Sequence, residues 1–367
     1  MVNPRLNRLL SAWKSHPSSA LALNPGPSLK YLTGLDFHLS ERPTLLVITP
    51  GGRAGLFLPE LEMAKVSFSR IPLEAYPFGE NPADWPQVLS QMFTALQIDA
   101  SALSVEPTCM RFLELDLLQR AIPGVNFTSS TDFLASLRMF KDDEEIACMR
   151  KAVEIAQHAL LSTLPHVKPG VTEKELASEL VLQLLRHGSD SELAFSPIVA
   201  GGPNSANPHA VPSERKLAEG DLLLFDWGAR YKGYSSDLTR TFAIGRVDEE
   251  FETIARAVLA ANRAGVTAGR AGVPACQVDR TAREAICAAG YGDYFTHRTG
   301  HGLGMETHEP PYIFAENELL LQPGMTYTVE PGIYLPERGG VRIEDNVVVR
   351  ADGAESLSDL PRDLIHL

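Results

Sequence analysis

The sequence has few of the features that mark secreted or membrane proteins. Its 367 residues include only four cysteines (Cys109, Cys148, Cys276 and Cys287), with no C-x-x-C pair and no zinc-like spacing. We therefore expect reduced core thiols rather than a disulfide scaffold. No apolar run reaches the ~18 residues of a membrane-spanning helix, and the N-terminal segment lacks the continuous apolar stretch of a signal peptide. These absences predict a cytoplasmic protein without a membrane partner.

Basic residues are also scarce, because 33 Lys and Arg stand against 46 Asp and Glu, a net charge of −13. This excess of acid argues against a nucleic-acid or anionic-membrane partner. Spare carboxylates can instead be balanced by bound cations. At 44% hydrophobic and 22% charged residues, the composition is that of an ordinary globular protein. At roughly 150 residues per domain, the length suggests about two domains.

Residues 1–136 alternate short helical and strand-like patterns, which predict a small α/β domain. Apolar residues at helical spacing open the segment, from Leu6 to Trp13. The runs TLLVITP and AGLFLPE, separated by two glycines and an arginine, predict a hairpin. Another helix is expected over 81–96. Since this part gathers no His, Cys or paired carboxylates, we expect no chemistry here.

From residue 137 the pattern changes to long amphipathic helices. Asp142 and Thr172 are each followed three residues later by Glu, the spacing of a capping box. Strand-like runs come next, then two helical stretches (251–268 and 277–289), then strand-like runs again. This order indicates a duplicated ααβ unit, and the second domain is expected to span 137–367.

The run FDWGARYKGYSSDLTRTF predicts a hairpin that carries two acids. Asp226 and Asp237 are placed symmetrically about a turn whose midpoint lies between Tyr231 and Lys232. Residues symmetric about a hairpin turn are cross-strand partners, and two carboxylates facing each other there repel. A cation between them reverses the sign of the interaction.

A second hairpin repeats this arrangement, with Glu330 and Glu344 symmetric about position 337 in strands otherwise rich in Val, Ile and Tyr. Any one such acid is most simply a solvated strand residue. Two opposed pairs in apolar strands instead favour an oxygen-rich site for divalent metals. Two metals bridged by carboxylates ~3.5–4 Å apart can activate a water between them.

The segment HRTGHGLGMETHEPP supplies three histidines, His297, His301 and His308, among glycines that permit close backbone approach. The glycines do not match G-x-G-x-x-G, and the segment lacks H-E-x-x-H, so neither a phosphate loop nor a zincin helix is indicated. A role in metal binding or proton transfer remains for these histidines.

Together these segments resemble the metallopeptidase family with the pita-bread fold, which includes Xaa-Pro dipeptidases (prolidases), Xaa-Pro aminopeptidases and methionine aminopeptidases. The match runs in family order through SPIVAGGPNSANPHA, FDWGARYKGYSSDLTRTF, HRTGHGLGMETHEP, TVEPGIY and GVRIED. The resemblance implies that Asp226 binds one metal and that His301 and Glu330 bind the other. Asp237 and Glu344 would bridge both.

The same resemblance implies further roles. His209 and His308 would contact substrate and stabilise the oxyanion, and Arg342 would orient a metal ligand. Residues 1–136 are similar to a creatinase-type N-terminal domain through YLTGLDF and LFLPELE. Methionine aminopeptidases lack that domain. The implied fold is α+β, a duplicated pita-bread catalytic domain preceded by a smaller α/β domain.

The implied reaction is hydrolysis of an N-terminal X–Pro bond by a hydroxide that bridges two metals. Glu330 would carry a proton to the leaving proline nitrogen. Family members use Mn, Co or Zn, and a carboxylate-rich site with one histidine favours Mn²⁺ slightly. Small peptides with proline in second position are the expected partners, and a homodimer is the common assembly.

Several alternatives remain. A binding protein that has lost catalysis, a creatinase-like hydrolase without metals, and a methionine aminopeptidase with an extra domain are each opposed by features above. The choice between Xaa-Pro dipeptidase and Xaa-Pro aminopeptidase rests on opposing cues. Many prolidases carry an Arg in the segment that reads PPYIFAENELLLQPGMTYTV here, which has none. Arg298, Arg338 or a partner subunit's N-terminal domain could replace it. The short loop LPERGG resembles compact prolidases, so we expect the dipeptidase.

Overall fold

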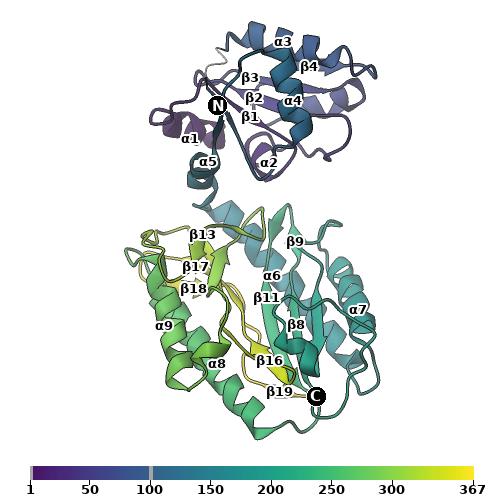
Figure 1. Ribbon diagram of the computed structural model, residues 1–367, viewed down its shortest axis with the longest axis vertical. Coiled ribbons are helices and arrows are strands. Elements are labelled where there is room, and N and C mark those ends of the chain that lie inside the picture. The colour runs from purple at the N-terminus through teal and green to yellow at the C-terminus, as the bar shows by residue number, and fades with distance from the viewer. Residues whose placement is uncertain (1–2, 99–101) are drawn as a thin grey trace. The chain divides into compact units, whose positions relative to one another are not determined.

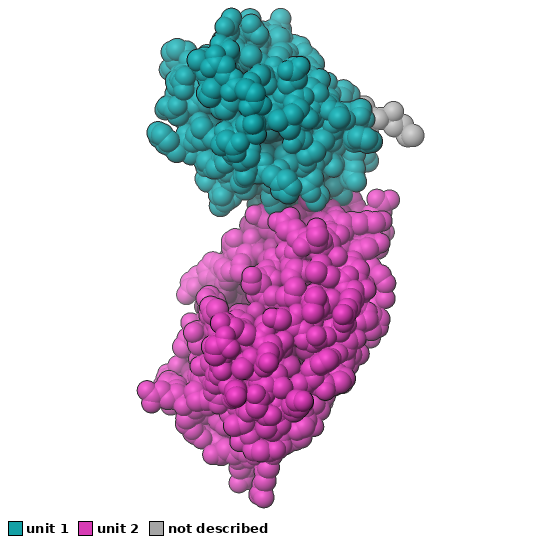
Figure 2. Space-filling view, turned by 90° about the vertical axis from the view of Figure 1, so that its right-hand side faces the viewer, with its two compact units in different colours: residues 1–138 teal, residues 139–367 magenta. Residues whose placement is uncertain are grey.

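The computed structural model describes residues 3–98 and 102–367. The chain divides into two compact units, residues 1–138 and 139–367 (Figures 1 and 2). None of the helices in the described ranges combines the length and apolar character needed to cross a bilayer.

The first unit is built on a six-stranded mixed sheet in the order β4-β3-β2-β1-β5-β6. The predicted hairpin is confirmed, because β2 pairs antiparallel with β3 and Leu45 lies opposite Phe57. The predicted opening helix and the helix expected over 81–96 are present as α1 and α3. Apolar side chains of α3 and α4 pack with those of the sheet in one core cluster. The elements are α1 (Pro4–Trp13), β1 (Ala20–Leu23), α2 (Pro27–Thr33), β2 (Leu45–Ile48), β3 (Ala54–Pro59), η1 (Glu60–Phe68), β4 (Glu74–Phe78), α3 (Trp85–Leu96), β5 (Leu103–Val105), α4 (Phe112–Ala121), β6 (Phe127–Ser129) and α5 (Thr131–Arg138).

The second unit contains four long helices, and in the view of Figure 1 α8 and α9 lie on one side of its strands and α7 on the other. Helix α6 begins at the predicted capping box, in which the Glu145 backbone N–H donates to Asp142 Oδ1 at 3.0 Å and the Asp142 N–H donates to Glu145 Oε2 at 2.9 Å. A second box at Thr172 opens α7. The four are α6 (Asp143–Thr163), α7 (Glu173–Arg186), α8 (Glu249–Ala268) and α9 (Ala275–Ala288).

The strands of the second unit form two larger sheets, ordered β19-β11-β8-β7 and β13-β12-β14-β17-β18, and two short ladders, β10-β9 and β15-β16. Two helices followed by strands occur twice along the chain, as predicted. The strands and short 3₁₀ helices are η2 (Leu164–His166), β7 (Ile198–Gly201), η3 (Gly202–Ala206), β8 (Leu222–Trp227), β9 (Arg230–Tyr231), β10 (Tyr234–Ser235), β11 (Leu238–Ala243), η4 (Gly292–Tyr294), β12 (Gly300–Gly302), β13 (Glu309–Ile313), β14 (Thr326–Val329), β15 (Gly332–Leu335), β16 (Gly339–Arg342), β17 (Asp345–Val349), β18 (Ala354–Ser356) and β19 (Ile365–His366).

The first acidic hairpin turns one residue later than predicted. Strands β8 and β11 place Thr239, not Asp237, opposite Asp226. The turn centres on Lys232 and Gly233, whose φ angles are 52° and 82°, because a two-residue hairpin turn of this kind requires positive φ at both positions. The prediction of direct opposition is therefore wrong. The two aspartates are diagonal neighbours across the hairpin.

The second acidic hairpin has the predicted register. Gly332 pairs with Arg342 in the β15–β16 ladder, and β14 pairs with β17 at the same offset. Glu330 and Glu344 lie between these two ladders, so the shared register places the two glutamates opposite each other across the hairpin.

All four cysteines carry free thiols. Cys276 is buried, but Cys287 is exposed near the end of α9. The expectation that all four lie in the core is therefore wrong for Cys287.

Candidate metal site

The five predicted metal ligands line one cavity of about 700 Å³ in the second unit. Strand β8 carries Asp226, Asp237 directly precedes β11, β12 carries His301, and the second hairpin carries Glu330 and Glu344. Within each of three overlapping groups the candidate ligand atoms lie within 4.8 Å of one another. The groups are Asp226 with Asp237 and Glu344, His301 with Glu330 and Glu344, and Asp237 with His301 and His308.

Asp226 presents one satisfied and one unsatisfied oxygen. Its Oδ2 accepts a hydrogen bond from Arg342 Nη2 at 2.5 Å. Its Oδ1 is buried and has no hydrogen-bond partner among the described residues. A buried carboxylate oxygen left without a partner destabilises the fold. Burial raises the pKa of Asp226, although the positive charge of Arg342 acts to lower it. A cation at Oδ1 would remove this penalty.

The other acids show the same need for positive charge. Burial, together with the charges of neighbouring carboxylates, raises the pKa of Asp237 and of Glu344 well above the ordinary range. Burial also acts to raise the pKa of Glu330, but the hydrogen bond and charge of His301 lower it to about 2. Four carboxylates and one imidazole form a donor set that suits divalent cations such as Mn²⁺, Co²⁺ or Zn²⁺. The residues present therefore fit the metals implied by the resemblance.

The histidine of this set has a defined orientation. His301 Nδ1 lies 3.1 Å from the carbonyl oxygen of Gly302, which can only accept, so Nδ1 carries the proton. Nε2 faces Glu330 Oε1 at 3.3 Å and Asp237 Oδ2 at 3.7 Å. With Nδ1 committed to this carbonyl, Nε2 is the nitrogen that faces the acids. It can donate a proton to Glu330, and a bound metal would take the place of that proton.

The two predicted substrate contacts, His209 and His308, also line the cavity, and both keep solvent access. The His308 ring meets the His301 ring edge-on, with centroids 4.0 Å apart. Partial burial and then the charge of His301 lower the pKa of His308 to about 4, so His308 is neutral at pH 7. A neutral imidazole can donate one hydrogen bond to a developing oxyanion.

We expect His308→Ala and His209→Ala to lower turnover while metal content stays intact. Loss of one donor to the oxyanion typically reduces kcat by roughly 10²–10³-fold. Elemental analysis and steady-state kinetics on the same preparations separate the two effects. The exposed His158 on α6 provides the matched control, since His158→Ala should change neither quantity. Wholesale loss of metal from His308→Ala would show that His308 is itself a ligand.

Arg342 makes the contacts that its predicted orienting role requires. Besides the bond to Asp226, its Nη1 donates to Tyr334 Oη at 2.9 Å and its Nε donates to Thr239 Oγ1 at 3.1 Å. Tyr334 Oη also lies 2.8 Å from His297 Nε2. His297, the first histidine of the glycine-rich segment, thus supports Arg342 through Tyr334, a role that its position in the sequence did not reveal.

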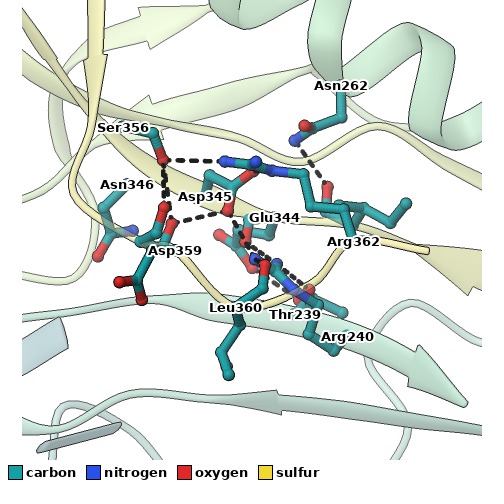
Figure 3. Close-up of polar contacts among 12 residues, drawn as sticks. Thr239, Arg240, Asn262, Glu344, Asp345, Asn346, Ser356, Asp359, Leu360 and Arg362 are labelled. Atoms are coloured by element: carbon teal, nitrogen blue, oxygen red, sulfur yellow. Dashed lines mark hydrogen bonds and ion pairs between the residues drawn. The ribbon is translucent and has the colours of Figure 1, made fainter. Parts of the chain in front are cut away.

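A buried ionic cluster behind Glu344, which the sequence patterns did not reveal, holds the backbone of this candidate ligand (Figure 3). Arg240 donates from Nη1 to the Glu344 carbonyl at 2.7 Å and from Nη2 to Asp345 Oδ1 at 2.8 Å. Arg362 Nε donates to Asp345 Oδ2 at 2.5 Å. Asp345 is fully buried. The sequence does offer one signal for this cluster, because Asp345 is a second acid next to Glu344 in an apolar strand. A buried charge in such a strand needs a partner.

Asn262 of α8 connects the two glutamate strands, and sequence analysis missed it as well. Its Nδ2 donates to the carbonyl of Val329 at 3.0 Å and to that of Ile343 at 3.4 Å. These residues directly precede Glu330 and Glu344. The available signal was a polar residue on the buried face of an amphipathic helix, where it must find hydrogen-bond partners.

Comparison with known protein families gives two matches. Residues 147–351 match the model of metallopeptidase family M24. Residues 5–140 match the model of the creatinase/prolidase N-terminal domain.

Individual relatives match along almost the whole chain. An Xaa-Pro dipeptidase of Pyrococcus horikoshii is 32% identical over 367 residues, which cover 100% of this chain and 99% of the relative. The crystal structure of a dipeptidase from the same organism has a TM-score of 0.92 at 39% identity, covering 99% of this chain and 100% of that one. An X-Pro aminopeptidase from Thermotoga maritima has a TM-score of 0.87 at 30% identity, with 100% of both chains covered. These likenesses confirm the predicted α+β fold.

Proposed function

The chain belongs to metallopeptidase family M24 and is a metallopeptidase, and from this premise we propose that it is an Xaa-Pro dipeptidase. The observation that carries the proposal is the convergence of four carboxylates and His301 on one cavity. The full-length likeness to an Xaa-Pro dipeptidase supports the substrate class.

In the proposed reaction the residues of the chain bind, orient and move protons. Divalent cations held by the five ligands would supply a water of lowered pKa and would polarise the scissile carbonyl. Glu330 accepts a proton from the attacking water and delivers it to the proline nitrogen as the C–N bond breaks. His308 donates a hydrogen bond to the oxygen that gains negative charge. Arg342 keeps the Asp226 carboxylate in place.

The cavity also suits the proline side of the bond. An X–Pro amide has no N–H, so a peptidase that binds it must recognise the ring rather than that donor. Part of the cavity wall is apolar and is formed by Phe195, Ile198 and Pro208. These side chains offer the non-polar surface that a pyrrolidine ring prefers.

The nearest alternative is an Xaa-Pro aminopeptidase, which the likeness to the T. maritima enzyme supports. The preferred substrate length distinguishes the two activities. We expect a higher kcat/KM for Ala-Pro than for Ala-Pro-Ala. The measurement is steady-state hydrolysis of both peptides by the same metal-loaded preparation. A tripeptide cleaved tenfold better, about 1.4 kcal/mol of transition-state preference, would establish the aminopeptidase instead. Met-Ala-Ser in the same panel tests for methionine aminopeptidase activity.

A further inference from the structure

The wall of the cavity carries two arginines, and only one of them is engaged by the protein. Each guanidinium nitrogen of Arg342 donates to the protein, to Thr239, Tyr334 or Asp226. Arg298 lines the same cavity. In the described ranges its guanidinium forms no hydrogen bond and no ion pair, and it lies over the face of an aromatic ring.

That ring holds the Arg298 guanidinium beside the candidate metal ligands. Its Cζ lies 4.5 Å from the centre of the Tyr312 ring, a cation–π distance. Tyr312 in β13 is the cross-strand partner of His301 in β12, and its carbonyl accepts a hydrogen bond from Asn317 Nδ2 at 2.6 Å. The positive charge of Arg298 also reaches His308, where it contributes to the lowered pKa. The aromatic face thus positions the guanidinium and leaves its N–H groups free.

The lining of the cavity offers charges of both signs to a zwitterionic dipeptide. Its four carboxylates are the candidate metal ligands, and these repel the carboxylate of a substrate unless cations neutralise them. A planar guanidinium with free donors binds a carboxylate through two parallel hydrogen bonds. The other candidate anchor, Arg338, pairs with Glu250 and Asp248 and does not line the cavity.

Building on the proposed function, we propose that Arg298, steadied by Tyr312, binds the C-terminal carboxylate of the substrate. This contact selects peptides in which proline is the last residue. It gives this chain a carboxylate anchor although the segment from 310 to 329 contains no Arg or Lys.

The test compares Ala-Pro with its C-terminal amide, Ala-Pro-NH₂, which has the same scissile bond but no carboxylate. The wild-type enzyme is expected to prefer Ala-Pro. Arg298→Met should lower kcat/KM for Ala-Pro by roughly 10- to 100-fold, mainly through KM, since hydrogen bonds to charged groups have that strength. Hydrolysis of the amide should change less than about twofold, because the amide lacks the charge. Arg298→Lys keeps the positive charge but lacks the planar pair of donors, so its kcat/KM for Ala-Pro should lie between those of Arg298→Met and the wild type.

Arg338→Met is the matched control and should leave both substrates unaffected. Metal content and thermal unfolding of each variant show whether the fold and the site survive. An equal loss for Ala-Pro and the amide in Arg298→Met and Arg298→Lys, or a selective loss in Arg338→Met, would overturn the role of Arg298. Failure of the metal-loaded wild-type enzyme to cleave Ala-Pro at all would refute the proposed function itself, so the two failures are distinguishable.

Discussion

Asp237→Asn and Glu344→Gln are each expected to abolish measurable metal binding and to reduce kcat/KM for Ala-Pro by roughly a thousandfold. Both residues belong to two of the three groups of converging ligand atoms. The carboxamide keeps the size of the side chain but removes the charge that attracts a cation. A lost metal removes several kcal/mol of transition-state stabilisation, and about 4 kcal/mol corresponds to this thousandfold loss.

Matched substitutions at exposed acids separate this effect from a general change in charge. Asp293 in η4 and Glu284 in α9 are both exposed. Asp293→Asn and Glu284→Gln should retain wild-type metal content and wild-type turnover. The assignment of the ligands would be wrong if Asp237→Asn and Glu344→Gln kept full metal occupancy and full activity.

Arg240→Met is expected to produce the largest loss of stability, about 3 kcal/mol or more in the free energy of unfolding of the second unit. The substitution removes the hydrogen bonds from Arg240 to the Glu344 carbonyl and to Asp345. Asp345, which is fully buried, then keeps Arg362 alone as a cationic partner. Breaking a buried pair by removing one partner typically costs about 3–5 kcal/mol. Denaturant unfolding followed by a probe in the second unit measures the change.

Arg350 supplies the comparison, because its ion pair with Glu355 is partly exposed and Nε lies 2.8 Å from Oε2. Exposed pairs contribute about 0–1 kcal/mol, so Arg350→Met should change stability little. Equal effects of the two substitutions would show that the cluster behind Glu344 contributes no more than a surface pair.

Local sequence patterns predicted the starts of helices and the register of a hairpin where a single local interaction determines them. The capping boxes at Asp142 and Thr172 mark the starts of α6 and α7. The register of the second acidic hairpin follows from symmetry about position 337. The turn of the first hairpin lies one residue beyond the position that symmetry of the acids predicts, because the positive φ angles at Lys232 and Gly233 determine the turn.

The site itself is built from segments far apart in the chain, and periodicity does not determine which of these segments meet. The two hairpin patterns pointed to Asp226, Asp237, Glu330 and Glu344, and resemblance to a family chose His301 among the three histidines. The structure brings all five to one cavity. Local patterns mark Asp345 and Asn262 as polar residues that need partners, but which groups they meet depends on tertiary packing. The preference for manganese and the homodimer stay predictions.

Metal dependence of Ala-Pro hydrolysis is the most direct measurement. The protein is treated with a chelator, its divalent metal content is determined by elemental analysis, and hydrolysis of Ala-Pro is measured before and after Mn²⁺, Co²⁺ or Zn²⁺ is added. We predict no hydrolysis by the metal-free protein and recovery of activity with at least one of these cations. Full activity in a preparation that contains no divalent transition metal would contradict the proposed mechanism.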